Sequence, residues 1–442
     1  MASSKTFTSS APVASPSRNR LASEDRAFHD WYRFVLSFPP HLVKHYLATF
    51  DVAHKHLVLD PFCGTGTTLV EAMKLGFDVV GIEANAMAHL ASRVKTNWST
   101  DAEQLSKRTS RICADVSEGL VDEGFLDADE ILHVREKNLF GLRDLPEEQA
   151  GLLLKNSISP LPLHKSLALI QQILKNTDDV SHAQQVALAK GLVGPIGNLH
   201  FGPEVGVLRK KRLDAPVVDI WRANVDAMVS DLRAVGSAVI PGSHVILGDS
   251  RGVIPQLGEQ SVSAVFTSPP YPNEKDYTRT TRLESVLLGL IKSKQDLRDM
   301  KQGMLRSNTR NIYVSDTDHE VGLQYDRIRE LCDKIESRRK ALGKTSGFER
   351  LYWKVTASYF GGMHRHLESL KPALADGAML GYVVGDQASY FRIHIRTGEL
   401  IAEIAENLGY ELVSIDLFRT RMATATRAQL REEVVVLRHK VK

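Results

Sequence analysis

Residues 56–83 read HLVLDPFCGTGTTLVEAMKLGFDVVGIE and carry the clearest evidence about the architecture. The apolar run 56–60 predicts a short buried strand, and residues 64–68 predict a tight turn. A helix is expected over 69–75, ending at Gly76, and a second strand over 78–83. Strands that alternate with helices are typical of a parallel sheet with right-handed crossovers.

The same alternation continues elsewhere in the chain, around two long interruptions. Further helices are predicted at 41–50, 86–98, 359–370 and 400–408, and further strands at 244–249, 262–266, 379–384, 411–417 and 433–437. No obvious crossover helix separates the last two strands, so an antiparallel hairpin is an alternative there. We therefore predict an α/β fold, a doubly wound seven-stranded Rossmann-like sheet with two largely helical insertions.

The interruptions suggest a division of the chain into four parts. Residues 1–23 are rich in Ser, Ala and Pro and are expected to form a disordered tail. Residues 24–98, 241–271 and 350–442 would together form one catalytic domain. Residues 99–240 and 272–349, which are rich in helix-forming side chains, are predicted to be the two insertions.

The composition is that of a globular protein with a sizeable core. Of 442 residues, 43% are hydrophobic and 25% are charged, which excludes a wholly disordered chain or a fibre. No apolar run approaches the ~20 residues that cross a bilayer, and no secretory signal is recognised. The three cysteines are too few and too scattered for a disulfide framework or a zinc set, so a reduced cytoplasm is expected. The net charge of +3 permits a polyanionic partner without requiring one.

The glycine turn predicts a nucleoside site that takes no phosphate. Gly64 and Gly66 let the backbone approach a ligand closely, but Leu69 replaces the third glycine of a dinucleotide fingerprint. The carboxylate of Asp60 would repel phosphate and attract an ammonium group. Glu83 ends the next predicted strand, where a carboxylate can accept hydrogen bonds from a ribose diol. Asp249, at the end of the third strand, could accept from an adenine amino group. A ribose, an ammonium group and no phosphate together indicate S-adenosylmethionine.

A second motif, Thr267-Ser268-Pro269-Pro270-Tyr271, follows the fourth predicted strand. The two prolines make a stiff turn whose carbonyl groups remain free to accept hydrogen bonds. Such acceptors, with the Ser268 hydroxyl, suit an exocyclic amino group held in plane, and the Tyr271 ring offers a face for a base. A base within a duplex could reach this turn only by being flipped out.

Together these motifs resemble the amino-methyltransferase branch of the DNA methyltransferases. By that resemblance, Ser268, Pro269, Pro270 and Tyr271 hold and activate the target amino group. The resemblance gives the first motif and the segment around Phe38 to the cofactor, with candidate binding residues Phe38, Asp60, Pro61, Phe62, Gly64, Gly66, Thr67, Thr68, Glu83 and Asp249. It implies direct displacement of the methyl group from S-adenosylmethionine, without a covalent enzyme intermediate.

The resemblance also bears on which base is the target. The Ser-Pro-Pro-Tyr form is commoner among cytosine-N4 enzymes than among adenine-N6 enzymes, so a cytosine-N4 DNA methyltransferase is the leading hypothesis. Adenine-N6 methylation of DNA, base methylation of RNA, small-molecule methylation and a non-catalytic nucleic-acid-binding protein remain alternatives. A cytosine-C5 enzyme would need a Pro-Cys nucleophile and a zinc deaminase a Pro-Cys-x-x-Cys motif, and both are missing.

Several weaker signals point to a duplex DNA partner. The basic run Arg209-Lys210-Lys211-Arg212 could contact phosphates, or could simply be a solvated surface. Asp276 and Tyr277 are close enough to the second motif to position a base, and Arg279, Arg306 and Arg310 follow it in a polar segment. No histidine spacing suggests a metal site. A cognate restriction or defence nuclease is a candidate second partner, and the sequence gives no indication of the oligomeric state.

Overall fold

The computed structural model describes most of the chain. The described residues are 21, 25–33, 37–52, 57–127, 141–201, 205–236, 238–252, 257–273, 275–422 and 429–440. The predicted tail 1–23 lies outside these residues except for Leu21.

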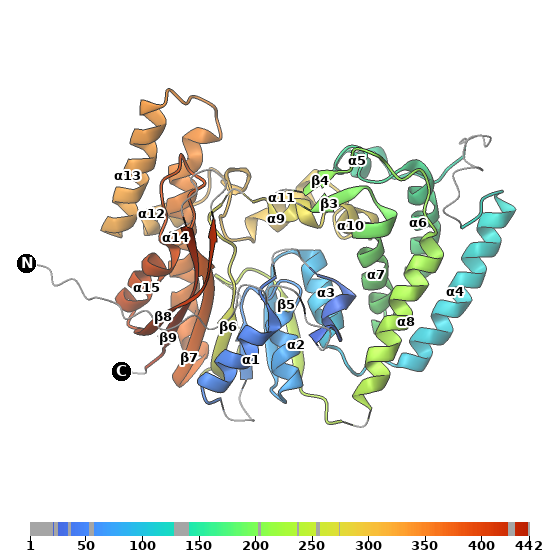
Figure 1. Cartoon of the computed structure of the whole chain (residues 1–442), viewed down its shortest axis with the longest axis horizontal. Helices are drawn as coiled ribbons and strands as arrows, with labels where there is room; N and C mark the ends of the chain where they lie inside the picture. Colours follow the sequence, from blue (N-terminus) through green and yellow to red (C-terminus); the bar gives the residue numbers. More distant parts are fainter. Residues whose placement is uncertain are drawn as a thin grey trace, which may run out of the picture.

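A mixed seven-stranded sheet forms the centre of the molecule (Figure 1). Its strands are β1 (Leu57–Asp60), β2 (Val79–Glu83), β5 (Ser243–Leu247), β6 (Val262–Thr267), β7 (Leu374–Gly385), β8 (Glu411–Met422) and β9 (Gln429–Arg438). They are ordered β5-β2-β1-β6-β7-β9-β8. Six of these strands run parallel to one another, and β9 is inserted antiparallel between β7 and β8. The predicted doubly wound sheet is confirmed, and so is the terminal hairpin.

The strand order places a switch point beside β1. The chain proceeds outward from β1 to β2 and β5 on one side, and from β6 to β7 on the other. Ligands of such sheets bind beyond the carboxyl ends of the strands at this point, because the connections diverge there and leave a crevice. The two motifs follow β1 and β6, so the topology brings them together.

Helices cover both faces of the sheet. Alternate side chains along each strand point to opposite faces, so they pack into two separate hydrophobic cores. On one face, Val58 and Phe266 pack with α1 (Pro40–Thr49) and α2 (Thr67–Lys74). On the other, the neighbouring residues Leu59 and Val265 pack with helices from the C-terminal part of the chain. Those helices are α13 (Asp326–Ala341), α14 (Tyr352–Leu370) and α15 (Thr397–Asn407). Burial of both faces explains why these strands are apolar almost throughout.

The predicted first insertion is largely helical and lies to one side of the sheet (Figure 1). It contains α4 (Ala102–Asp122), α5 (Glu147–Ala150), α6 (Pro160–Ile173), α7 (Asp179–Gly191) and α8 (Val217–Val235). It packs on α3 (Ala86–Thr96), which in turn contacts β2 and β5. Between α7 and α8 the chain forms a π-helical turn, Leu192–Ile196, and a small hairpin of β3 (Leu199–Phe201) and β4 (Val205–Val207).

The predicted second insertion is also helical. It contains α9 (Tyr277–Thr280), α10 (Arg282–Leu287), α11 (Lys294–Gln302) and α12 (Asp318–Gly322), followed by α13. Single-turn 3₁₀ helices lie at His29–Trp31, Thr309–Asn311, Glu349–Leu351 and Lys371–Ala373. The limits of the two insertions, as domains, remain predictions.

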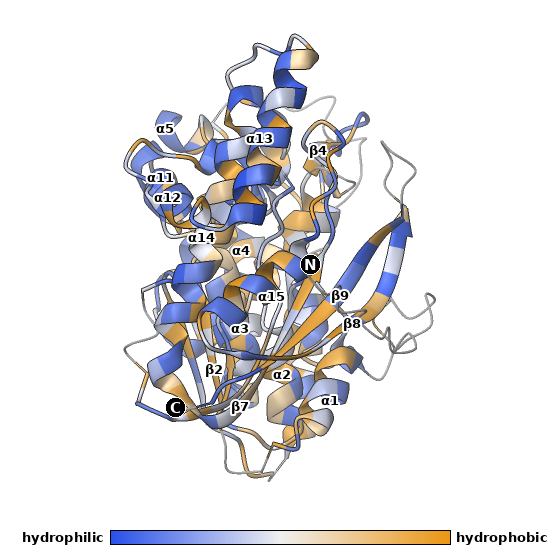
Figure 2. Cartoon of the chain, turned by 90° about the vertical axis from the view of Figure 1, so that its left-hand side faces the viewer, coloured by the Kyte–Doolittle hydropathy of each residue, from blue (hydrophilic) through white to orange (hydrophobic). Residues whose placement is uncertain are grey.

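Hydropathy follows this layering. Figure 2 shows apolar strands at the centre of the molecule and hydrophilic residues along α13, while β8 and β9 extend away from the core. Among the described residues, no helix combines the length and the apolar character needed to span a bilayer.

Candidate active site

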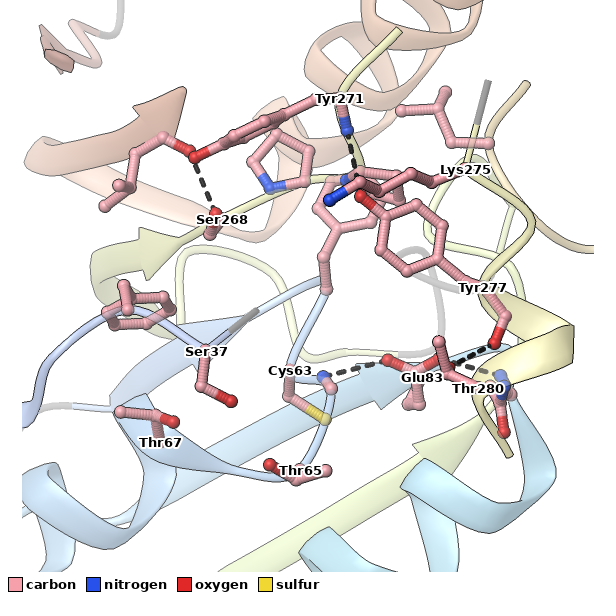
Figure 3. A pocket seen from close by; sticks show the side chains of 18 of the residues that line it. Ser37, Cys63, Thr65, Thr67, Glu83, Ser268, Tyr271, Lys275, Tyr277 and Thr280 are labelled. Atoms are coloured by element: carbon pink, nitrogen blue, oxygen red, sulfur yellow. Dashed lines mark hydrogen bonds between the residues drawn. The ribbon is translucent and has the colours of Figure 1, made fainter. Parts of the chain in front are cut away.

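A cavity of about 560 Å³ opens at the carboxyl ends of β1 and β6. Both motifs line it, the first through residues 61–65 and Thr67, the second through residues 268–271 (Figure 3). Phe38, which precedes α1, lines the cavity as well and packs edge-on against Phe266 with ring centroids 5.7 Å apart. The structure thus brings the two motifs to one cavity, as their strand-end positions require.

The glycine turn depends on close packing against α3. Gly64 and Gly66 have φ angles of 51° and 83°, which side chains with a Cβ rarely adopt. A Cβ on Gly66 would also lie 3.1 Å from the Cβ of Ser92. Lys95, on α3, donates through Nζ to the carbonyl of Thr65 at 2.9 Å, and burial lowers the pKa of Lys95 to about 7. Sequence reasoning missed Lys95, since a lysine within a helix is ordinarily a surface residue.

Glu83 lies at the end of β2 and lines the cavity, as predicted. Its carboxylate accepts from the backbone N–H groups of Gly64, at 2.8 Å, and Asn85, at 2.7 Å. These two bonds fix the carboxylate but leave each oxygen with an unused lone pair. Burial raises the pKa of Glu83 to about 7, although the backbone bonds oppose that shift.

Asp60 occupies a different place from the one expected. It is not among the described residues that line the cavity, and it is 1% exposed. Its Oδ1 accepts from the Thr267 hydroxyl at 2.6 Å and from the Phe62 N–H at 3.1 Å, so it ties the two motifs together. Its buried Oδ2 has no hydrogen-bond partner among the described residues, and burial raises the pKa of Asp60 to about 6.

The expectation that Asp249 ends the third strand is wrong. Strand β5 ends at Leu247, and the Asp249 carboxylate pairs with the Arg251 guanidinium at 2.6 Å. Gly248 and Ser250 line the cavity, whereas Asp249 does not. If Asp249 also contacted adenine as predicted, its carboxylate would have to accept hydrogen bonds from both Arg251 and the base.

Thr68, in the first turn of α2, also lies outside the cavity lining. Its buried hydroxyl donates to the carbonyl oxygen of Phe266 at 3.0 Å, which joins α2 to β6 beneath the turn.

The second motif holds Ser268 in a defined orientation. The Ser268 hydroxyl donates to the carbonyl oxygen of Val383 at 3.0 Å. Figure 3 shows this bond as the dashed line at Ser268, and the Tyr271 side chain lies near enough to Ser268 to interact with it. The Tyr277 hydroxyl accepts from the Tyr271 backbone N–H at 3.4 Å, and burial raises the pKa of Tyr277 to about 12.

Comparison with known proteins agrees with this arrangement. The N6_N4_Mtase family model, described as DNA methylase, matches residues 15–93. Over 460 residues the chain is 23% identical to the Type II methyltransferase M.BsoBI of Geobacillus stearothermophilus, covering 95% of this chain and 86% of that protein. It is also 23% identical to the Type II methyltransferase M.AvaI of Nostoc sp., over 94% of this chain and 87% of that protein. These matches confirm the resemblance to amino-methyltransferases of the N6/N4 type.

A shorter match is to the Type II methyltransferase M.MjaII of Methanocaldococcus jannaschii, 29% identical over 119 residues. It covers 26% of this chain and 22% of that protein. The family-model match spans the glycine turn and Glu83 but ends well before Ser268. The roles of the individual site residues therefore remain predictions.

The candidate DNA contacts are placed unevenly. Tyr277 lines the cavity. Asp276 is buried, caps α9 by accepting from the Thr278 N–H, and pairs with Lys301 at 2.8 Å. Arg279 is half-buried, and its Nε has no hydrogen-bond partner among the described residues. Arg310 is exposed. Contact of these residues with DNA remains a prediction.

Arg306, a candidate DNA contact, has its guanidinium already engaged within the protein. Arg306 is 4% exposed and forms a two-pronged ion pair with Asp316, with both N···O distances 2.7 Å. Its Nη1 donates to the backbone carbonyls of Lys301, Gln302 and Met304. The guanidinium thus organises a buried turn, and Leu305 beside it lines the cavity.

The basic run follows β4 and divides into two pairs. Arg209 and Lys210 are exposed. Lys211 and Arg212 are half-buried and donate to backbone carbonyls, Lys211 to Leu208 and Arg212 to Gly197 at 2.5 Å. Only the first pair has the exposure that a phosphate contact requires.

The far wall of the cavity was missed altogether. It consists of polar residues from several elements, with lining members Lys275, Gln387, Ser389, Arg419, Arg421 and Glu432. The spacing of these residues carries no motif. The pairing of β7, β8 and β9 brings five of them together, whereas Lys275 follows the second motif in the chain. Elsewhere, the described residues contain no group of three or more His, Cys, Asp or Glu side chains placed to hold a metal ion.

Proposed function

We propose that this chain methylates the exocyclic N4 amino group of a cytosine in duplex DNA, with S-adenosylmethionine as the methyl donor. The observation that carries the proposal is the state of Ser268. Its proton is committed to the carbonyl oxygen of Val383, so that Oγ offers the cavity only an acceptor. An amino group is the donor that such a site suits, and fixed acceptors favour its pyramidal, nucleophilic form.

The cofactor proposal has independent support at the glycine turn. The cavity has room for a nucleoside, Glu83 has lone pairs free for a ribose diol, and Asn85 and Phe38 line the same region. Bound there, S-adenosylmethionine supplies a methyl group on a positively charged sulfur. Asp60 would act indirectly, because its hydrogen bond with Thr267 sets the position of the second motif relative to the first.

The substrate proposal rests on the family and on the shape of the site. The matched family model is described as DNA methylase, and both full-length relatives carry the designation Type II. Residues of both insertions line the cavity beside the second motif, and a duplex base would have to leave the stack to reach that motif. A restriction nuclease that cuts the same sequence is the partner that the Type II designation suggests.

The test is transfer of a labelled methyl group from S-adenosylmethionine to unmethylated plasmid DNA by purified protein. Ser268→Ala should lower the single-turnover rate by ~10²-fold or more, since it removes an interaction made to the reacting group. Affinities for DNA and for S-adenosylhomocysteine should be unchanged. Ser261→Ala is the matched control, because that exposed hydroxyl donates to the carbonyl oxygen of Gly258, away from the cavity lining. Equal rates for the wild type and Ser268→Ala would refute the proposed role.

A further inference from the structure

We propose that Arg419, on β8, reads the edge of the target base next to its amino group and thereby selects cytosine over adenine. This inference rests on the proposed function and adds the residue that decides the base. Arg419 lines the cavity together with Phe418.

A break in the strand pairing explains how adjacent residues reach the same cavity. In a regular strand Phe418 and Arg419 would point to opposite faces of the sheet. The register between β8 and β9 shifts between Leu417 and Arg419, where Leu417 opposes Glu433 and Arg419 opposes Glu432. Such a bulge redirects side chains and is frequent beside active sites. It lets the two neighbours line one wall.

The Arg419 guanidinium is held from two sides. Its Nε pairs with the carboxylate of Glu432, and its central carbon lies 5.5 Å from the centroid of the Phe418 ring. Its two terminal nitrogens make no hydrogen bond to any residue that the structure describes, and the side chain remains 30% exposed. The planar fork is therefore positioned while its outer N–H groups stay available.

Arg421 helps to hold Glu432 in place, but its own guanidinium is occupied by contacts within the protein. It donates through Nη2 to the Gln387 side-chain oxygen at 3.1 Å and to the Asp386 carbonyl at 3.0 Å. Its Nε lies 3.3 Å from the second oxygen of Glu432. Glu432 is thus shared by two arginines, which compensates the burial of its charge and fixes its side chain.

The ion pair between Arg419 and Glu432 lies next to the second motif. A Cβ on Gly385 would lie 3.1 Å from the Tyr271 ring and 3.3 Å from Cγ of Glu432, so only a glycine separates them. Tyr271 belongs to the same motif as Ser268, and both line the cavity. Arg419 therefore belongs to the same wall as the acceptor for the amino group.

The chemistry of the two bases then decides the selectivity. Beside its amino group cytosine presents two adjacent acceptors, N3 and O2, which match the two parallel N–H donors of a guanidinium. Adenine presents N1 and then a C–H group, so one donor would lose its partner. A bidentate contact of this kind discriminates between bases by about ten- to a hundredfold. A flipped base is read at this edge.

The experiment compares Arg419→Lys with the wild type on duplexes that carry either cytosine or adenine at the methylated position, within a site mapped on plasmid DNA. Lysine keeps the charge and removes the fork. We expect kcat/KM on cytosine to fall about ten- to a hundredfold, with kcat/KM on adenine changed at most a few-fold. The matched control is Arg438→Lys, since Arg438 pairs with Glu411 at the other end of the hairpin.

Three results would overturn the inference. The first is an unchanged kcat/KM on the cytosine duplex, and the second is an equal reduction of kcat/KM on both duplexes. The third is a reduction of kcat/KM together with a smaller salt dependence of DNA binding, which would mark Arg419 as a phosphate contact. Unchanged binding of S-adenosylhomocysteine and an unchanged melting temperature show that Arg419→Lys is folded. Failure of the proposed function is recognised separately, because the wild-type protein would then methylate neither duplex or only the adenine duplex.

Discussion

Two buried carboxylates beside the glycine turn illustrate how individual residues divide the work of the site. Glu83 lines the cavity and keeps lone pairs for a ligand, whereas Asp60 lies behind it and bonds to Thr267. Burial raises the pKa of both groups, because the charged form loses its hydration. Their protonation should therefore affect function close to neutral pH.

Cofactor affinity should follow the ionisation of Glu83. Only the carboxylate form accepts from both ribose hydroxyls, and the pKa of Glu83 is about 7, so affinity should fall as the pH is lowered. Between about pH 8 and about pH 6 the dissociation constant for S-adenosylhomocysteine should rise roughly tenfold, as the ionised fraction falls. Isothermal titration calorimetry measures this. Glu83→Gln should bind more weakly with a flatter pH profile, and Glu259→Gln, on the surface, should behave as wild type. An equally steep profile in Glu83→Gln would contradict the assignment.

Residue types and spacing predicted the two motifs and Glu83, because a strand followed by a glycine turn leaves few alternative placements. They did not predict the burial of Arg306 or the contact from Lys95 to Thr65. Both are charged side chains whose partners lie on other segments. Composition alone favours a solvated position for such residues, and only tertiary packing overrides that preference.

At the scale of elements, two helices of the C-terminal half meet unusually closely. A Cβ on Gly361, within α14, would lie 1.8 Å from the carbonyl oxygen of Asp318 on α12. A Cβ on Gly322 would lie 2.1 Å from the carbonyl oxygen of Ala357. Asp318, which lies where α12 contacts α14, forms ion pairs with Arg251 and Arg365. Glycine therefore permits the close crossing of these two helices.

Gly361→Ala should accordingly destabilise the protein. The backbones would have to separate, at a cost of about 2 kcal/mol in the free energy of unfolding. Gly119→Ala on α4 is the matched control, because a Cβ there meets nothing within 4 Å. That change should instead stabilise the protein by ~0.5–1 kcal/mol. Urea unfolding of both variants is the measurement, and equal stabilities would contradict the close contact.

The sheet itself was largely predictable at this scale, and its terminal bulge was not. Apolar runs mark the strands because both faces are buried, and the missing crossover pointed to the hairpin. The shift at Phe418 depends on how β8 pairs with β9, which single-strand patterns do not encode. The bulge places Arg419 on the cavity wall. The residues proposed to face the target base were therefore missed for the same reason.

On the scale of the whole molecule, two helical groups flank the central sheet. Helices of the first insertion lie on one side of the sheet, and α12 to α14 lie on the other (Figure 1). Both insertions reach the cavity, the first through Val193 and Phe201 and the second through Lys275 and Leu305. Sequence could not show this, because the insertions interrupt the strand pattern and carry no motif of their own.

The exposed pair Arg209 and Lys210 should contribute to DNA binding by neutralising phosphates. Replacing both with alanine should reduce the slope of log K against log salt by up to about 2, because each phosphate that a side chain neutralises adds about 0.9 to that slope. Lys107→Ala with Arg111→Ala is the matched control, since both are exposed on α4. Fluorescence anisotropy across a salt series gives the slopes. Identical slopes for the two double variants would exclude a role of Arg209 and Lys210 in phosphate binding.

The central claim is that the chain forms N4-methylcytosine in DNA through Ser268. The most direct measurement is mass spectrometry of nucleosides from plasmid DNA coexpressed with the wild type or with Ser268→Ala, in a host that lacks its own DNA methyltransferases. The account predicts N4-methylcytosine with the wild type and none with the variant. N6-methyladenine in its place, or equal modification by both proteins, would contradict it.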